Sequence, residues 1–369
     1  MCAFHRLSRG SEATEDPTAA SSTQDPSLQV RIPELGVEMQ SNLKVSCPEI
    51  TSEMNLMTKD WERVMSDHYI ASTEKLPPRA LMLLKRWDVK NRNYTDEDLA
   101  RADVLIGWEE NVTSDLIRKA KKLRVIQTLS AGVNAIPFRL LRNVRVFSNP
   151  AAFANPVAEH AWALILGLAK NINRVEKQES YQVYRLTLLV IGCGGIGSKV
   201  AEIGLKAFGM RTIGVSRSFY RPRLFDERHG MTKLTQALSQ ADVIVSTLPL
   251  TRLTEGILDY DKLARTKQGA IIVNVGRGNV MREADIYRLL VERPRTRFGT
   301  DVFWIKEGAE VFESKLWELD NFMGTPHQAG AVKTNRDVFD NVVLAGVQNL
   351  TRYLRSGTAR NEVRVGDYL

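Results

Sequence analysis

Short apolar runs alternate with amphipathic stretches through the second half of the chain. The runs predict strands over residues 187–191, 211–215, 242–246, 270–274, 297–302 and 322–325. Between most of them apolar residues recur at helical spacing, as over 234–240 and 282–293. Apolar strands separated by helices are typical of a parallel sheet covered on both faces. The pattern therefore predicts an α/β fold with a doubly wound parallel sheet over residues 155–325.

A second alternation of the same kind precedes this region. Apolar runs predict strands over 43–47, 103–107 and 123–128, and helical spacing predicts a helix over 111–123. A long apolar helix over 157–170 would connect the two units, and a helical pattern over 337–355 is expected to return to the first. We therefore predict two Rossmann-like domains with a cleft between them. The first domain is discontinuous and consists of residues 43–154 and 326–369, and the second consists of residues 155–325.

The first 42 residues differ from the rest in composition. Residues 10–27 are rich in Ser, Thr, Ala, Pro and acidic side chains, with little to bury, which is typical of a disordered tail. A transit peptide is the alternative, favoured by the basic residues near the start. The acidic residues that follow argue against it, because such peptides are poor in acids.

Charge and cysteine content exclude several other classes. The 51 basic and 43 acidic side chains give a formal net charge of +8, but the basic residues are scattered and form no nucleic-acid motif. The longest apolar run, 161–169, is too short to cross a bilayer. Cys2, Cys47 and Cys193 lie far apart, so neither a disulfide framework nor a metal site is expected. We expect a cytoplasmic protein with small-molecule partners and no nucleic-acid or membrane partner.

A glycine-rich segment follows the strand over 187–191. Gly192 would permit a tight turn, Gly194 would let the backbone approach a pyrophosphate, and Gly197 would allow close packing of the next helix. Gly195 and Ile196 complete the loop. Because strand, glycines and helix occur in the required order, the segment predicts a dinucleotide site at a helix N-terminus. We therefore expect residues 155–325 to be the dinucleotide-binding domain and residues 43–154 and 326–369 to be the substrate-binding domain.

Three side chains follow strands at the carboxyl edge of the predicted sheet, where ligands bind in such folds. Arg277 lies in Asn274-Val275-Gly276-Arg277-Gly278 and could grip a carboxylate with two parallel hydrogen bonds, or it could be a surface arginine in a turn. His327 ends Thr325-Pro326-His327; an imidazole suits proton transfer near neutral pH, although a lone histidine is more often structural. Glu307, six residues after Asp301, would by itself be a solvated surface acid.

Together these segments resemble the D-isomer-specific 2-hydroxyacid dehydrogenases, among them the glyoxylate/hydroxypyruvate reductases. The resemblance runs from about residue 103 to the C-terminus. It rests on the glycine loop and the segments at 274–278 and 325–327, and on three further motifs. These are Leu129-Ser130-Ala131-Gly132-Val133-Asn134, Asn155-Pro156-Val157-Ala158-Glu159-His160 and Thr247-Leu248-Pro249-Leu250-Thr251.

The resemblance implies an oxidoreductase that transfers a hydride between a nicotinamide cofactor and a small 2-keto or 2-hydroxy acid. Arg277, Glu307 and His327 would be the catalytic residues. His327 would move a proton at the keto oxygen, a carboxylate beside it would favour the imidazolium, and Arg277 would bind the substrate carboxylate. Because the family's usual Glu-Pro is shifted by one residue here, Glu310 is the rival of Glu307 as the histidine's partner.

The resemblance also implies the residues that surround cofactor and substrate. Backbone N–H groups of Ala131, Gly132 and Val133 would hold a carboxylate oxygen, and loops of the first domain between Trp108 and Val112 could contact the substrate's side chain. Asp301 would contact the nicotinamide amide. The remaining cofactor contacts would come from turns that follow strands, at Thr247, Leu248, Pro249, Val275, Gly276, Arg277 and His327. No metal is expected.

The end of the second predicted cofactor strand bears on the choice of cofactor. NAD-dependent enzymes normally place an acid there to bind the ribose 2′-hydroxyl. This chain has Ser216, Arg217 and Ser218, so no carboxylate repels a phosphate and Arg217 could pair with one. The sequence predicts a preference for NADP(H), with NAD(H) possible.

A second function class stays open at this point. The fold is shared by dinucleotide-sensing corepressors without significant turnover, which resemble the enzymes at Arg277 and His327. The resemblance also implies a homodimer. A phosphoglycerate dehydrogenase with an added regulatory module is disfavoured, since only 42 residues follow His327.

Overall fold

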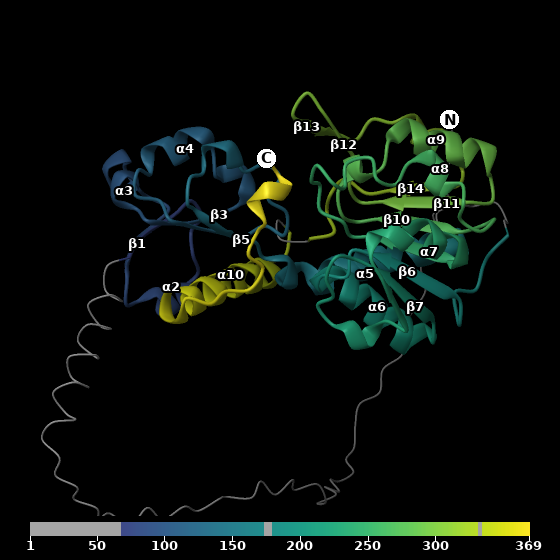
Figure 1. Cartoon of the computed structure of the whole chain (residues 1–369), viewed down its shortest axis with the longest axis horizontal. Helices are drawn as coiled ribbons and strands as arrows, with labels where there is room; N and C mark the ends of the chain where they lie inside the picture. The colour runs from purple at the N-terminus through teal and green to yellow at the C-terminus, as the bar shows by residue number, and fades with distance from the viewer. Residues whose placement is uncertain (1–67, 173–178, 331–333) are drawn as a thin grey trace, which may run out of the picture. The chain divides into compact units, whose positions relative to one another are not determined.

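The computed structural model describes residues 68–172, 179–330 and 334–369. Within these ranges, two parallel sheets define two lobes (Figure 1). The predicted tail and the strand predicted over 43–47 lie outside the described residues.

The first lobe is built on a five-stranded parallel sheet, counted over the described residues, in the order β2-β1-β3-β4-β5. Its strands are β1 (Tyr69–Ser72), β2 (Asp88–Asn91), β3 (Val104–Gly107), β4 (Val125–Thr128) and β5 (Arg145–Phe147). Alternate strand residues face opposite layers. Tyr69 and Ala71 pack with α3 (Asp96–Arg101) and α4 (Ser114–Lys119), while Ile70 packs with α2 (Pro78–Leu84) and α10 (Arg336–Ser356).

The second lobe is built on a seven-stranded parallel sheet, again counted over the described residues, in the order β14-β11-β10-β9-β6-β7-β8. Its strands are β6 (Thr187–Ile191), β7 (Arg211–Val215), β8 (Glu227–His229), β9 (Val243–Ser246), β10 (Ile271–Asn274), β11 (Arg297–Thr300) and β14 (Phe322–Gly324). α5 (Ala154–Lys170) and α6 (Gly195–Phe208) cover one face. α7 (Leu234–Gln240), α8 (Tyr260–Leu263) and α9 (Glu283–Glu292) cover the other.

The order of these strands positions the site. The first strand of this lobe, β6, pairs with both β7 and β9, so the direction of winding reverses between β6 and β9. Ligands of doubly wound sheets bind outside the carboxyl ends of the strands at such a reversal. The glycine-rich segment lies at this point, because it directly follows β6.

The predicted α/β class with doubly wound parallel sheets is confirmed. All six strands predicted in the second half are present, while the edge strand β8 and the antiparallel hairpin of β12 (Trp304–Lys306) and β13 (Ala309–Val311) were not predicted. We propose the domain boundaries at 154/155 and 325/326, supported by α10, whose buried residues pack with the first sheet.

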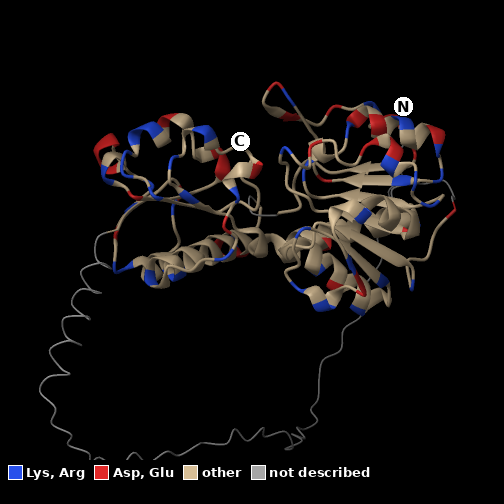
Figure 2. Cartoon of the chain, in the orientation of Figure 1, with Lys and Arg blue, Asp and Glu red and all other residues tan. Residues whose placement is uncertain are grey.

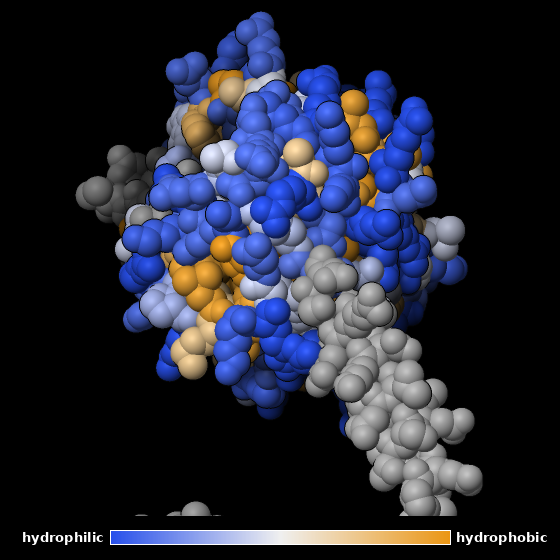
Figure 3. Space-filling model, turned by 90° about the vertical axis from the view of Figure 1, so that its left-hand side faces the viewer, coloured by the Kyte–Doolittle hydropathy of each residue, from blue (hydrophilic) through white to orange (hydrophobic). Residues whose placement is uncertain are grey.

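Surface charge is mixed in sign. Figure 2 shows basic and acidic residues interspersed on outer helices such as α3, α4 and α9, while the strands carry few of either. On the face shown in Figure 3, apolar residues form small groups separated by hydrophilic ones. Among the described residues, no helix combines the length and apolarity that a membrane span requires.

Candidate active site

The glycine-rich turn after β6 has the geometry that its sequence predicts. Gly192 has a φ of +95°, and its carbonyl oxygen accepts a 2.6 Å hydrogen bond from Thr247 Oγ1 at the end of β9. A Cβ atom at Gly197 would lie 2.1 Å from that same carbonyl oxygen, so only glycine lets α6 pack this closely on the turn. The first turn of α6 therefore offers backbone N–H groups and the positive end of a helix dipole.

The same turn leaves room for a phosphate group. A Cβ atom at Gly194 would meet no described atom within 4 Å, whereas one at Gly195 would lie 3.1 Å from the Cα of Ala151. The backbone at Gly194 is thus open to a ligand. Tight turn, open approach and helix N-terminus together fit a dinucleotide pyrophosphate.

Two more turns follow β9 and β10 at this edge of the sheet. Thr247, Leu248 and Pro249 form the first, and Val275 and Gly276 begin the second. A Cβ atom at Gly276 would lie 2.4 Å from the carbonyl oxygen of Leu248, so the two turns pack closely. A cavity of about 620 Å³ opens beside these turns, and Ile196 and Val275 are among the residues that line it.

Arg277 leaves the end of β10 and is held on several sides. The Asn274 side chain shapes its turn by donating to the carbonyl oxygen of Arg277 and accepting from the N–H of Gly276. Arg277 Nε donates to Asn134 Oδ1 at 2.8 Å, and Arg277 Nη2 donates to Glu109 Oε1 at 2.9 Å. Because each terminal guanidinium nitrogen carries a second N–H group, the side chain can still bind a ligand.

The loop after β4 lies directly against this guanidinium. A Cβ atom at Gly132 would lie 1.7 Å from Arg277 Nη2, so the close approach depends on glycine. Ala131 and Gly132 line the cavity, whereas the Val133 side chain is buried in the core of the first lobe. Glu109 is fixed from this side too, since its Oε2 accepts from the N–H of Ala135.

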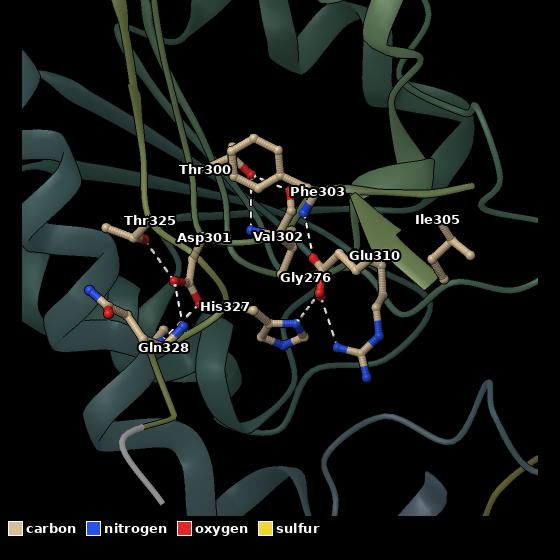
Figure 4. Close-up of polar contacts among 12 residues, drawn as sticks. Gly276, Thr300, Asp301, Val302, Phe303, Ile305, Glu310, Thr325, His327 and Gln328 are labelled. Carbon is tan, nitrogen blue, oxygen red and sulfur yellow. Dashed lines mark hydrogen bonds and ion pairs between the residues drawn. The ribbon is translucent and has the colours of Figure 1, made fainter. Parts of the chain in front are cut away.

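Asp301 fixes the turn that carries His327 (Figure 4). Its Oδ1 accepts from Thr325 Oγ1 and the N–H of Gln328, and its Oδ2 accepts from the N–H of Ala329. His327 has a φ of +50°, an uncommon conformation that its N–H contact to the carbonyl oxygen of Asp301 helps hold. Asp301 was expected to contact a nicotinamide amide. Both of its carboxylate oxygens already accept hydrogen bonds within this turn.

The acid beside His327 is Glu310. His327 Nδ1 and Glu310 Oε2 lie 2.6 Å apart, and Glu310 Oε1 accepts from the N–H of Phe303 (Figure 4). This arrangement leaves Nε2 of His327 without a hydrogen-bond partner among the described residues, and His327 lines the cavity.

The expected pairing of Glu307 with His327 is wrong. Glu307 and Gly308 form the two-residue turn of the β12–β13 hairpin, with φ values of +53° and +85°, and Glu307 is exposed. The hairpin pairs Ile305 with Glu310, which carries the second acid back toward the sheet. The rival residue thus occupies the position expected for Glu307.

The contacts of Glu310 change its ionisation. Burial by itself would raise the pKa of this carboxyl group. The hydrogen bond and charge of His327, with smaller contributions from Phe303 N–H and Arg277, outweigh burial and hold the pKa of Glu310 below its usual value. Glu310 is therefore an ionised partner for the imidazole at neutral pH.

The candidate catalytic residues Arg277, Glu310 and His327 lie on one cavity. Ala131, Gly132, Arg277, Asp301, Glu310 and His327 all line the volume of about 620 Å³, together with Glu109 and Glu110 from the loop after β3. Ser216, Arg217 and Ser218 follow β7, and Arg217 pairs with Asp367 at 2.8 Å.

Sequence reasoning did not assign three of these polar residues. Glu109 lies in the Trp108–Val112 stretch that was expected near the substrate, but its contact with Arg277 joins residues 168 positions apart. His160, in a motif quoted for the family resemblance, contacts Thr325 Oγ1 at 2.7 Å. Nothing in the local sequence signals that Asp367 meets Arg217.

Comparison with known proteins identifies the family. Residues 150–329 match the family model described as D-isomer specific 2-hydroxyacid dehydrogenase, NAD binding domain. A hydroxypyruvate reductase of Thermotoga maritima is 30% identical over 272 residues, which cover 69% of this chain and 88% of the relative. The chain belongs to the D-isomer-specific 2-hydroxyacid dehydrogenase family.

Other relatives of this dehydrogenase family carry different names. A D-3-phosphoglycerate dehydrogenase of Methanocaldococcus jannaschii is 32% identical over 286 residues, which cover 73% of this chain but only 53% of that relative. The chain thus spans about half the length of that protein. A solved family member from Aeromonas salmonicida superposes with a TM-score of 0.64 at 27% identity and covers 81% of this chain and 100% of the solved one.

Proposed function

We propose that this dehydrogenase reduces a small 2-keto acid, such as glyoxylate or hydroxypyruvate, to the corresponding 2-hydroxy acid, which is the D isomer where the product is chiral. NADPH would be the preferred hydride donor, with NADH possible. The observation that carries the proposal is the His327–Glu310 pair on the same cavity as Arg277. The nicotinamide supplies the hydride when bound. Family membership and the name of the Thermotoga maritima relative support this reaction.

His327 would be the acid and base of the reaction. With Nδ1 facing Glu310, its Nε2 is free to donate a proton to the keto oxygen during reduction and to remove it in the reverse direction. The Glu310 carboxylate beside Nδ1 fixes the ring's orientation. The left-handed backbone and the Asp301 contacts hold the histidine in place before substrate arrives.

Arg277 would bind the substrate carboxylate and stabilise the charge that develops on the keto oxygen. Its second N–H groups on Nη1 and Nη2 are the donors left for this purpose. Backbone N–H groups at Ala131 and Gly132, which line the cavity, would hold the other carboxylate oxygen. Glu109 and Asn134 would act as positioning residues for the guanidinium.

The charge of the cavity favours an unphosphorylated substrate. Among the described lining residues, the acids are Glu109, Glu110, Asp301 and Glu310, whereas the groups that can carry positive charge are Arg277 and His327. Both of these already face carboxylates. A phosphate would need an unmatched cation nearby, so we expect hydroxypyruvate to be reduced far better than its 3-phosphate.

The preference for NADP(H) rests on the loop after β7. The glycine turn fits either dinucleotide, but Ser216 stands where an acid would bind a 2′-hydroxyl, and Arg217 follows it. We expect a higher kcat/KM with NADPH than with NADH. Arg217→Ala should weaken NADPH binding much more than NADH binding; equal losses would argue against a phosphate contact.

The function is tested by mixing the purified protein with NADPH or NADH and a panel of 2-keto acids. We expect loss of nicotinamide absorbance with glyoxylate or hydroxypyruvate, and chiral chromatography should identify the D-hydroxy acid as the product of hydroxypyruvate. If cofactor binds and no keto acid is turned over, the dinucleotide-sensing alternative replaces the enzyme.

We further propose a homodimer in the cytoplasm. The family resemblance supports the dimer, and the scattered cysteines support a reducing compartment. Light scattering on the eluting protein measures the mass, for which we expect twice the 41.5 kDa of one chain.

A further inference from the structure

The last residues of the chain form a hook that is anchored on the first lobe. We use this name for residues 365–369, which include the short 3₁₀ helix Val365–Asp367. The Tyr368 ring stacks on Phe138 at a centroid distance of 4.8 Å. Just before the hook, the N–H of Val363 donates to the carbonyl oxygen of Val146 at 2.8 Å. These contacts hold the hook against the core of the first lobe.

The hook also contacts two loops of the second lobe. Asp367 Oδ2 lies 2.8 Å from Arg217 Nη1, in the loop after β7. The carbonyl oxygens of Gly366 and Asp367 accept from Arg252 Nη2 and from its backbone N–H, at 3.0 and 3.2 Å. Arg252 directly follows the 247–251 motif after β9. The hook therefore bridges both loops at the edge of the sheet where the dinucleotide is expected.

The ion pair with Asp367 engages the Arg217 guanidinium, which is the group that a 2′-phosphate would need. The Asp367 side chain is only 16% exposed, against 48% for Arg217, so the aspartate is the more enclosed partner. The nearby Arg221 is also engaged, because its Nη1 contacts Glu202 at 3.0 Å. A 2′-phosphate that binds Arg217 must share or displace a carboxylate, whereas NADH has no group that makes this demand.

We propose that Asp367 is a specificity-determining residue for the cofactor: it competes with the 2′-phosphate of NADPH for Arg217 and so limits the preference for NADPH. The proposal rests on the function proposed above. The mechanism is competition between two anions for one guanidinium. Removing the carboxylate charge should favour NADPH, and it should leave NADH nearly unaffected.

The test is a titration of the full-length protein with NADPH and with NADH, read by tryptophan and nicotinamide fluorescence, so that it requires no turnover. Asp367→Asn should lower the Kd for NADPH by about fivefold, the effect of losing a competing ion pair worth up to about 1 kcal/mol. The Kd for NADH should stay within about twofold. In an Arg217→Ala background, Asp367→Asn should change neither constant.

Glu362→Gln is the matched control. Glu362 lies five residues before Asp367 and pairs with Arg145 on the first lobe, so the variant makes the same change of net charge away from Arg217. It should leave the NADPH-to-NADH ratio of Kd values unchanged. Thermal midpoints of all variants within a few degrees of wild type would show that they fold.

Three results would overturn the proposal while the reductase function stands. The ratio could be unchanged by Asp367→Asn, Glu362→Gln could shift it equally, or Asp367→Asn could weaken NADH binding instead. The last result would show that Asp367 serves the ribose 2′-hydroxyl. Failure of the wild-type protein to bind either dinucleotide would overturn both proposals.

Discussion

His327 Nδ1 and Glu310 Oε2 are 2.6 Å apart. His327 lies in the turn after β14, and Glu310 lies in the β12–β13 hairpin. The contact determines which ring nitrogen can face a substrate. The hairpin also provides an internal control, because Glu307 lies in its exposed turn whereas Glu310 contacts the histidine.

Glu310→Gln should reduce kcat for hydroxypyruvate by about 10- to 100-fold, as expected when a partner that orients and charges a functional group is lost. The Kd for NADPH should change little, because Glu310 lies beside the histidine and not at the glycine turn. Glu307→Gln should leave both constants within about twofold of wild type. Equal effects of the two substitutions would contradict the assignment of Glu310.

The lowered pKa of Glu310 predicts a pH-dependent contribution to stability. In the unfolded chain this carboxyl titrates at its ordinary value, so the folded state binds its proton less readily. A lowered native pKa stabilises the fold above the unfolded pKa, and the contribution is lost as the pH falls through the native pKa.

The difference in thermal midpoint between wild type and Glu310→Gln measures this contribution. It should be largest above the ordinary carboxyl pKa of about 4.5 and should shrink as the pH falls below that value. Scanning fluorimetry in a series of buffers gives the midpoints. A difference that stays constant down to about pH 3 would show that the ionised carboxylate is not what stabilises the fold.

Gly132→Ala should displace the guanidinium of Arg277, because the added Cβ would lie 1.7 Å from Nη2. Loss of a charge-assisted hydrogen bond to the substrate costs about 1.5–3 kcal/mol, so KM should rise by about tenfold or more. The Kd for NADPH should not change. Gly230→Ala is the control, since a Cβ there meets no described atom within 4 Å; equal KM values in the two variants would refute the role of Gly132.

Alanine substitutions at Gly194 and Gly197 should have different effects: one should weaken cofactor binding, and the other should lower the stability of the fold. Gly197→Ala places a Cβ 2.1 Å from the carbonyl oxygen of Gly192 and should destabilise the fold by about 1–3 kcal/mol, seen as a lower thermal midpoint. Gly194→Ala meets no described atom and should keep the wild-type midpoint. It should raise the Kd for either dinucleotide by about tenfold or more, because the methyl group fills the approach to the pyrophosphate. Unchanged binding in Gly194→Ala would mean that the phosphates lie elsewhere.

The second lobe was predictable because its strands are buried on both faces. Thr187–Ile191 and Arg211–Val215 match their predictions at both ends. Four consecutive apolar residues mark the first of these strands, as expected for a strand buried on both faces. Strands β1 and β5 were missed because, at four and three residues, they are shorter than most strands and form no distinct apolar run. The other missed parallel strands, β2 and β8, are short, polar and at sheet edges, where burial imposes no pattern. Asp88–Asn91, for example, contains one apolar residue.

The residues of the candidate site were predictable only where a reactive side chain lies within a few residues of the end of a strand. Arg277 and His327 do so, and both line the cavity. Glu310 does not, because its place depends on the register of a hairpin. Gly308 suits the positive φ that a two-residue hairpin turn requires, and a turn at 307–308 would have indicated Glu310 in place of Glu307. The Asp367–Arg217 contact joins distant segments of the chain and has no local signal.

The most direct test of the account is the turnover of His327→Asn with hydroxypyruvate and NADPH. Asparagine tolerates the left-handed backbone at this position, so the turn should be kept. We predict that kcat falls by about 10²- to 10⁴-fold, the usual contribution of a positioned acid and base, while the Kd for NADPH stays at the wild-type value. A kcat within about tenfold of wild type would contradict the assignment of proton transfer to His327.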